Sequence, residues 1–229
     1  AEIHPHLKFQ YSQNFELNSR INLALNFYQT DNLNNSLKLF HSCAQIADRL
    51  LSQFSSQMMN CQYYIGLIHF QQRHIDFAFE SILKSLLIQE RYYDETDPDL
   101  AFKLSILGKL AIAANQKVLA FGFFSRAAKI TNAFFPFHSW CVRTELDAAQ
   151  ALNGIDADLS VKYAQSAIES CKRINAPPQM LGNSYLVASA IACEGGKLNL
   201  ATKFIEEAAK YSKSDEIGKI RIKIAQKQN

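Results

Sequence analysis

Side chains of matching size recur along this chain at intervals of about forty residues. The motif is a small residue, a bulky or apolar residue four positions later, and a second small residue three positions after that. The second small residue falls at Cys43, Ser85, Ala127, Ala167 and Ala208, which gives steps of 42, 42, 40 and 41 residues. Because these spacings follow the helical period, the motif predicts a helix face that packs closely against a neighbouring helix. A fixed period of this length indicates a repeat protein.

Short polar or small turns divide each repeat into two helices. They lie at residues 31–35, 72–74, 115–116, 153–154 and 195–196. Each repeat is therefore predicted to be a helical hairpin, with the recurring motif on its second helix. One hairpin cannot bury its own apolar face, so we expect consecutive hairpins to stack side by side with their first helices lining a concave surface.

Composition and charge narrow the class of protein. The chain of 229 residues is 48% hydrophobic and has only 8 Gly and 5 Pro, too few for a fold of many short strands. Its five cysteines form no CxxC pair, which argues against a disulfide framework or a zinc site and favours a reducing cytosol or nucleus, of which we expect the cytoplasm. No apolar stretch approaches the ~18 residues of a membrane span. A net charge of +3 does not favour nucleic acid as a partner.

The segment 104–130, LSILGKLAIAANQKVLAFGFFSRAAKI, places Leu-Gly on the first helix and Ala, Phe and Ala on the second. This pattern resembles the tetratricopeptide repeat (TPR), and the unit of about 42 residues resembles the long-linker subtype of kinesin light chains. The resemblance implies an all-α, right-handed superhelical solenoid of about five TPR-like hairpins plus a C-terminal capping helix, in one domain over residues 1–229. The expected repeats are 16–56, 57–96, 97–138, 139–176 and 177–212, and the expected cap helix is 214–228.

A fold of this kind implies a non-catalytic scaffold or adaptor that binds a protein partner's peptide or helix in the concave groove. Amide side chains would bind the partner's backbone, aromatic rings would supply contact area, and a lysine would meet an anion. Each candidate could instead pack against the next hairpin, because inter-repeat packing occupies much of every first helix. The candidate partner-binding residues are Asn22, Tyr63, Phe70, Phe102 and Lys109.

Two other functions stay open: a peptide-sensing regulatory domain of a signalling or transcription regulator, and an architectural subunit that self-associates or assembles a larger complex. The sequence has neither a GxSxG elbow nor a glycine-rich phosphate loop, so we expect no enzyme, cofactor or small-molecule substrate. His69 and His74 are five positions apart, whereas a helical metal pair needs four, so we expect no metal site. A membrane surface is not an expected partner.

Overall fold

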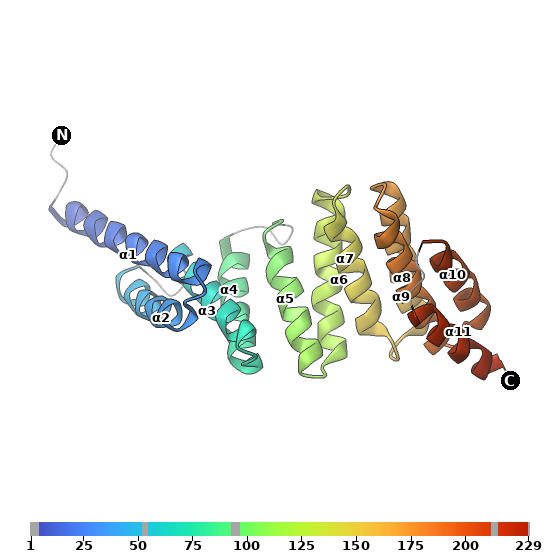
Figure 1. The fold of residues 1–229 in the computed structure, drawn as a ribbon. Coiled ribbons are helices and arrows are strands. Elements are labelled where there is room, and N and C mark those ends of the chain that lie inside the picture. The colour runs from blue at the N-terminus through green and yellow to red at the C-terminus, as the bar shows by residue number, and fades with distance from the viewer. Residues whose placement is uncertain (1–4, 52–54, 93–96, 212–214, 229) are drawn as a thin grey trace. The chain divides into compact units, whose positions relative to one another are not determined.

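The computed structural model describes residues 5–51, 55–92, 97–211 and 215–228, with the side chains of these residues except 5–12 and 228. Every regular element within these ranges is an α-helix, and Figure 1 shows the eleven helices in chain order. They gather into two compact units, residues 1–96 and 97–229. The assignment of the whole chain to one domain stays a prediction. None of the described helices is both long enough and apolar enough to cross a lipid bilayer.

The first unit consists of two helical hairpins that stack side by side. Its helices are α1 (Pro5–Gln29), α2 (Leu33–Leu50), α3 (Ser56–Gln71) and α4 (Ile75–Tyr92). α1 packs against α2, α2 against α3, and α3 against α4. The side chains of Leu17, Phe40, Ile65 and Ile68 are buried at its centre. α1 begins eleven residues before the expected repeat, and it starts at a proline, whose fixed φ suits the first position of a helix.

The second unit, taken by itself, consists of three hairpins and a terminal helix. Its helices are α5 (Leu100–Ala113), α6 (Lys117–Phe134), α7 (Ser139–Leu152), α8 (Ala157–Arg173), α9 (Pro178–Glu194), α10 (Leu198–Tyr211) and α11 (Asp215–Gln228). Each helix from α5 to α10 packs against the next, and α11 packs against both α9 and α10. The buried side chains of Ile217 and Ile224 attach α11 to this core. α11 therefore caps the last hairpin.

A left-handed residue lies in the turn of each of the five hairpins. The φ angles are 59° at Asp31, 62° at Arg73, 57° at Asn115, 81° at Gly154 and 75° at Gly196. Glycine, asparagine and aspartate tolerate this conformation, whereas an arginine rarely adopts it. The polar and small residues that mark the turns in the sequence are thus the residues that reverse the chain.

Close helix contact within a hairpin depends on glycines that face the bulky residue of the motif. A Cβ atom added at Gly66 of α3 would lie 2.6 Å from the side chain of Ile82 in α4. At Gly108 of α5 it would lie 2.6 Å from the ring of Phe124 in α6. Both distances are below van der Waals contact, so each bulky side chain fills the space that the missing Cβ leaves.

Buried serines add a polar contact to several hairpins. The Oγ atom of Ser36 donates to the carbonyl of Ala24 at 2.9 Å, and Ser160 Oγ donates to the carbonyl of Ala149 at 2.7 Å. Both serines are first small residues of the motif and are fully buried. Each hydroxyl therefore fits the tight interface and has a hydrogen-bond partner there.

Polar contacts also connect neighbouring turns in the second unit. Lys117 Nζ, at the start of α6, donates to the carbonyl of Asn153 after α7 at 3.2 Å. The side-chain amide of Asn153 donates to the carboxylate of Glu194 at the end of α9. Lys197, before α10, forms an ion pair with Asp158 of α8. Lateral stacking of the hairpins is thus fixed at their turns as well as in the core.

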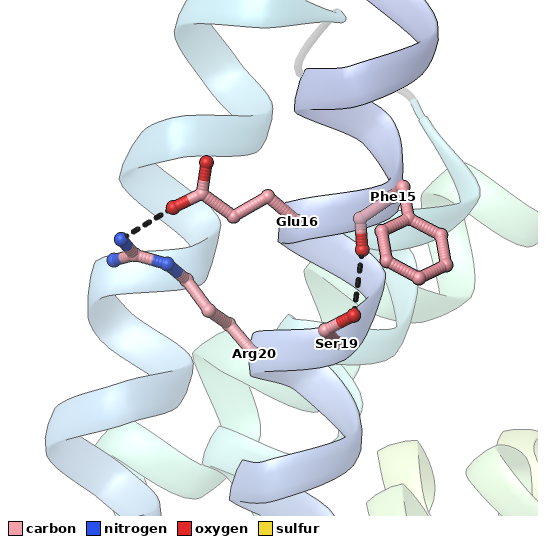
Figure 2. A network of polar contacts seen from close by, with 4 residues as sticks. All are labelled: Phe15, Glu16, Ser19 and Arg20. Atoms are coloured by element: carbon pink, nitrogen blue, oxygen red, sulfur yellow. Dashed lines mark hydrogen bonds and ion pairs between the residues drawn. The ribbon is translucent and has the colours of Figure 1, made fainter.

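The exposed face of α1 is stabilised by contacts one helical turn apart. Arg20 Nη2 lies 2.7 Å from Glu16 Oε1, and Ser19 Oγ donates to the carbonyl of Phe15 at 2.9 Å (Figure 2). Exposed ion pairs of this spacing contribute about 0.3–0.5 kcal/mol. They support the helix locally but do not determine how it packs.

All five cysteines are free thiols with buried side chains. They lie on five different helices, of which two belong to the first unit and three to the second. Each one behaves as a small apolar residue of the interior. The thiols are Cys43 on α2, Cys61 on α3, Cys141 on α7, Cys171 on α8 and Cys193 on α9.

Candidate protein-interaction surface

The five predicted binding residues divide between the two units. Asn22 on α1, with Tyr63 and Phe70 on α3, belong to the first unit. Phe102 and Lys109 lie on α5 of the second unit. Asn22, Phe102 and Lys109 are exposed, whereas Tyr63 and Phe70 are partly buried. All five therefore retain surface that a partner could contact.

Tyr63 lies at the edge of an aromatic cluster in the first unit. Its ring lies 5.3 Å from that of Tyr64 at an interplanar angle of 72°, and Tyr64 stacks on the buried ring of Phe40 at 5.2 Å. Tyr28 of α1 meets the edge of Tyr64, and its hydroxyl accepts a hydrogen bond from Gln71 Nε2 at 3.0 Å. Burial raises the pKa of Tyr28, with a further contribution from Tyr64 and an opposing one from Gln71. The cluster joins α1, α2 and α3, so much of its aromatic area serves packing.

Phe102 also contacts a neighbouring hairpin. Its ring centroid lies 4.0 Å from that of Trp140 at the start of α7, and Phe135 contacts the same indole at 5.5 Å. Phe102 nevertheless keeps 52% of its surface exposed. It contributes to the α5–α7 interface and leaves a half-exposed ring beside it.

A cavity of about 490 Å³ opens between α7 and α9, the first helices of the last two hairpins. Six of its lining residues come in two groups of three, one from each helix. α7 contributes Arg143, Asp147 and Gln150, and α9 contributes Gln179, Met180 and Asn183. The groove therefore combines one carboxylate, one guanidinium and three amides around a flexible apolar side chain. We call these six residues the α7–α9 groove.

Asp147 is the electrostatic centre of this groove. Its Oδ2 atom is buried and has no hydrogen-bond partner. Burial raises the pKa of its carboxyl, while the positive charges of Lys109 on α5 and Arg143 on α7 act in the opposite direction. A buried carboxylate oxygen without a donor carries a desolvation cost that a ligand N–H or ammonium group would remove. The groove can thus gain free energy by binding a hydrogen-bond donor.

The side chains of the α7–α9 groove are suited to binding a peptide. Amides and charged side chains supply the donors and acceptors that a peptide backbone requires. Among the residues that the model describes, no group of three or more His, Cys, Asp or Glu side chains is arranged to hold a metal ion. The site is best described as a groove of mixed polar and apolar lining between two first helices.

Substitution of Asp147 tests the electrostatic description. Folding raises the pKa of this carboxyl, so the folded protein holds the proton more tightly than the unfolded chain does. The charged carboxylate therefore lowers the free energy of unfolding at pH values above about 3.9, the pKa of an aspartate in the unfolded chain. This loss disappears as the pH falls toward that value. We expect Asp147→Asn to raise the free energy of unfolding at pH 7 and to have less effect near pH 4, as measured by urea denaturation.

Glu169→Gln is the matched control, because Glu169 is an exposed carboxylate on α8. It should change stability little at either pH. If Asp147→Asn produced the same gain at pH 4 as at pH 7, ionisation of Asp147 would not be the cause.

Lys109, whose charge acts on Asp147, was among the residues predicted from the sequence, whereas the α7 residues of the groove were not. A step of 41 residues carries Phe102, Ile106 and Lys109 onto Arg143, Asp147 and Gln150, which are spaced as one face of a helix. This polar stripe lies on a helix whose other residues are mostly buried. Extending the face assigned to the third repeat into the fourth would have found all three α7 residues.

Comparison with protein-family models and with curated proteins finds no match to this sequence. Several solved structures do resemble the model. The structure of the kinesin light chain-like, nearly identical TPR-like repeats of Podosopora anserina has a TM-score of 0.70 and 14% identity, over 87% of this chain and 98% of that one. BtubC from P. vanneervenii has a TM-score of 0.68 and 12% identity, over 91% of each chain.

YrrB, described as a TPR protein with an unusual peptide-binding site, has a TM-score of 0.66 and 13% identity, over 86% of this chain and 87% of its own. At such identities the similarity shows the fold alone. The fold class predicted from the sequence, an all-α solenoid of five TPR-like hairpins with a C-terminal capping helix, is confirmed.

Proposed function

We propose that this chain is a non-catalytic protein-interaction module that binds a peptide or helical segment of a protein partner in the α7–α9 groove. One observation carries the proposal: Asp147, whose buried Oδ2 atom has no hydrogen-bond donor, lines a cavity together with amide side chains and Arg143. A partner that brings a lysine, an arginine or a backbone N–H to this atom would satisfy it.

Solved structures of similar fold support a peptide ligand. YrrB has a peptide-binding site, and a Rap protein, which resembles this chain with a TM-score of 0.53 and 14% identity, is complexed with competence and sporulation factor. The Rap resemblance covers 86% of this chain and also supports the alternative of a peptide-sensing regulatory domain. In both roles the first event is the same, namely binding of a short segment by the helices.

The remaining predicted residues extend the proposed surface in each unit. In the second unit, Lys109 would pair with an anionic group near Asp147, and the half-exposed ring of Phe102 would give apolar contact area. In the first unit, Asn22, Tyr63 and Phe70 would form a separate contact region. More specifically, we propose that the chain is a cytoplasmic adaptor whose repeats are of the long-linker, kinesin-light-chain-like subtype.

The experiment is selection of peptides from a random displayed library on the complete chain, followed by affinity measurement on variants. We expect selected peptides to carry Lys or Arg and Asp147→Asn to weaken their binding about tenfold, because a charge-assisted hydrogen bond is lost. Asp147→Asn is not expected to destabilise the fold at neutral pH, so lost binding would not reflect unfolding.

Glu169→Gln serves again as the control and should leave the affinity unchanged, since its carboxylate is exposed on α8. Equal affinities for Asp147→Asn and the unmodified chain would contradict the groove assignment. If Tyr63→Ala with Phe70→Ala abolished binding instead, the partner would occupy the first unit.

A further inference from the structure

Two histidine rings face each other across the α3–α4 turn. His69 lies in the last turn of α3 and His74 directly precedes α4, with the left-handed Arg73 between them. Their Nδ1 atoms are 3.4 Å apart. The backbone fixes this approach, because the N–H of His74 donates to the carbonyl of His69 at 2.9 Å. Residues five apart in sequence thus bring two ring nitrogens within 3.4 Å of each other.

The separation of these nitrogens matches a metal chelate. Tetrahedral zinc with Zn–N bonds of 2.0–2.1 Å places two ligand nitrogens roughly 3.3 Å apart. From this geometry we propose that His69 and His74 form a two-imidazole site for a divalent transition-metal ion such as Zn²⁺, Ni²⁺ or Cu²⁺, with water at the remaining positions. Imidazole nitrogen suits these ions, whereas Mg²⁺ prefers oxygen ligands.

One ring of the pair is held by packing and the other is open to solvent. His69 is partly buried, and its ring packs against Phe77 with centroids 5.4 Å apart. Burial lowers the pKa of His69, and the neighbouring His74 and His41 lower it further. His74 is exposed, which leaves the site open to ions from solution.

A third imidazole lies close but is not placed as a ligand. The ring centroid of His41 on α2 is 6.4 Å from that of His69, compared with 5.6 Å between His69 and His74. Two rings on one tetrahedral zinc have centroids about 5.2 Å apart, given the same Zn–N bond length. The 5.6 Å pair needs only a small rotation to reach this value, whereas His41 would need a larger movement. His41 therefore provides an internal control.

The test is calorimetric titration of the complete chain with Zn²⁺ at pH 7, with Mg²⁺ as the negative control. One-to-one binding of Zn²⁺ is expected, and His69→Gln and His74→Gln should each weaken it about tenfold or more. His41→Gln should retain the affinity. The double variant His4→Gln with His6→Gln should also retain it, and this variant removes the two N-terminal imidazoles as a competing site.

A second readout separates chelation from a hydrogen bond between the two rings. Bound Zn²⁺ joins the end of α3 to the start of α4, so it should raise the thermal unfolding midpoint of the unmodified chain but not of His74→Gln. Absence of Zn²⁺ binding, binding that survives both single substitutions, or loss of binding in His41→Gln or in the N-terminal double variant would overturn the proposal.

Discussion

Gly108→Val is expected to lower the free energy of unfolding by about 3 kcal/mol. Even the first carbon of a side chain here would lie 2.6 Å from the ring of Phe124, which is buried and cannot turn away into solvent. The helices α5 and α6 would have to separate, and the packing on both sides of the contact would be lost. Urea denaturation followed by circular dichroism measures the change.

Gly122→Ala on α6 is the matched control, because nothing lies within 4 Å of a Cβ at this exposed position. It should raise stability by about 0.5–1 kcal/mol, the usual gain when alanine replaces glycine within a helix. Phe124→Leu should recover part of the loss when it is combined with Gly108→Val. A loss below about 1 kcal/mol for Gly108→Val would show that the ring and the glycine are not in tight contact.

Phe40→Ala is expected to cost about 3–5 kcal/mol, the range for removing a buried aromatic ring from a core. Phe40 occupies in α2 the position that Phe124 occupies in α6, between the two small residues of the motif. It is fully buried and stacks on Tyr64, so the substitution leaves a cavity and also removes an aromatic contact. Chemical denaturation of the purified variant measures the loss.

Phe15→Ala controls for the removal of an aromatic ring as such. Phe15 lies on α1 and is 76% exposed, so its loss should change stability by no more than about 0.5 kcal/mol. If the two variants lost similar free energies of unfolding, the contribution of a phenylalanine to stability would not depend on its position in the motif.

Packing within each hairpin could be predicted from the sequence because it depends on volumes at fixed spacing. The second small residue of every motif is fully buried in the structure, from Cys43 to Ala208. The same step of 42 residues carries Gly66 onto Gly108 and Ile82 onto Phe124, and these residues make the two glycine contacts that bring the helices together. The turns could be predicted from short runs of polar or small residues, and four of the five left-handed residues in them are Asp, Asn or Gly.

The α7–α9 groove depends on side chains from separate hairpins, and a repeat pattern does not show which polar atom lacks a partner. Lys109 was predicted from its position on α5, but the sequence did not show that its positive charge acts on Asp147 of α7. Spacing also argued against the pair His69 and His74, since a helical metal pair is four residues apart. A tight turn brings the two rings together instead, and this depends on the left-handed conformation of Arg73.

The burial of all five thiols has a practical consequence for following the unfolding of this chain. A cysteine-alkylating reagent can reach a buried sulfur only when the surrounding helices open, so labelling rates in native buffer report the free energy of local opening. Mass spectrometry of the modified peptides would resolve these rates at α2 and α3 separately from α7, α8 and α9. The sequence thus carries its own probes of local opening in four of the five hairpins.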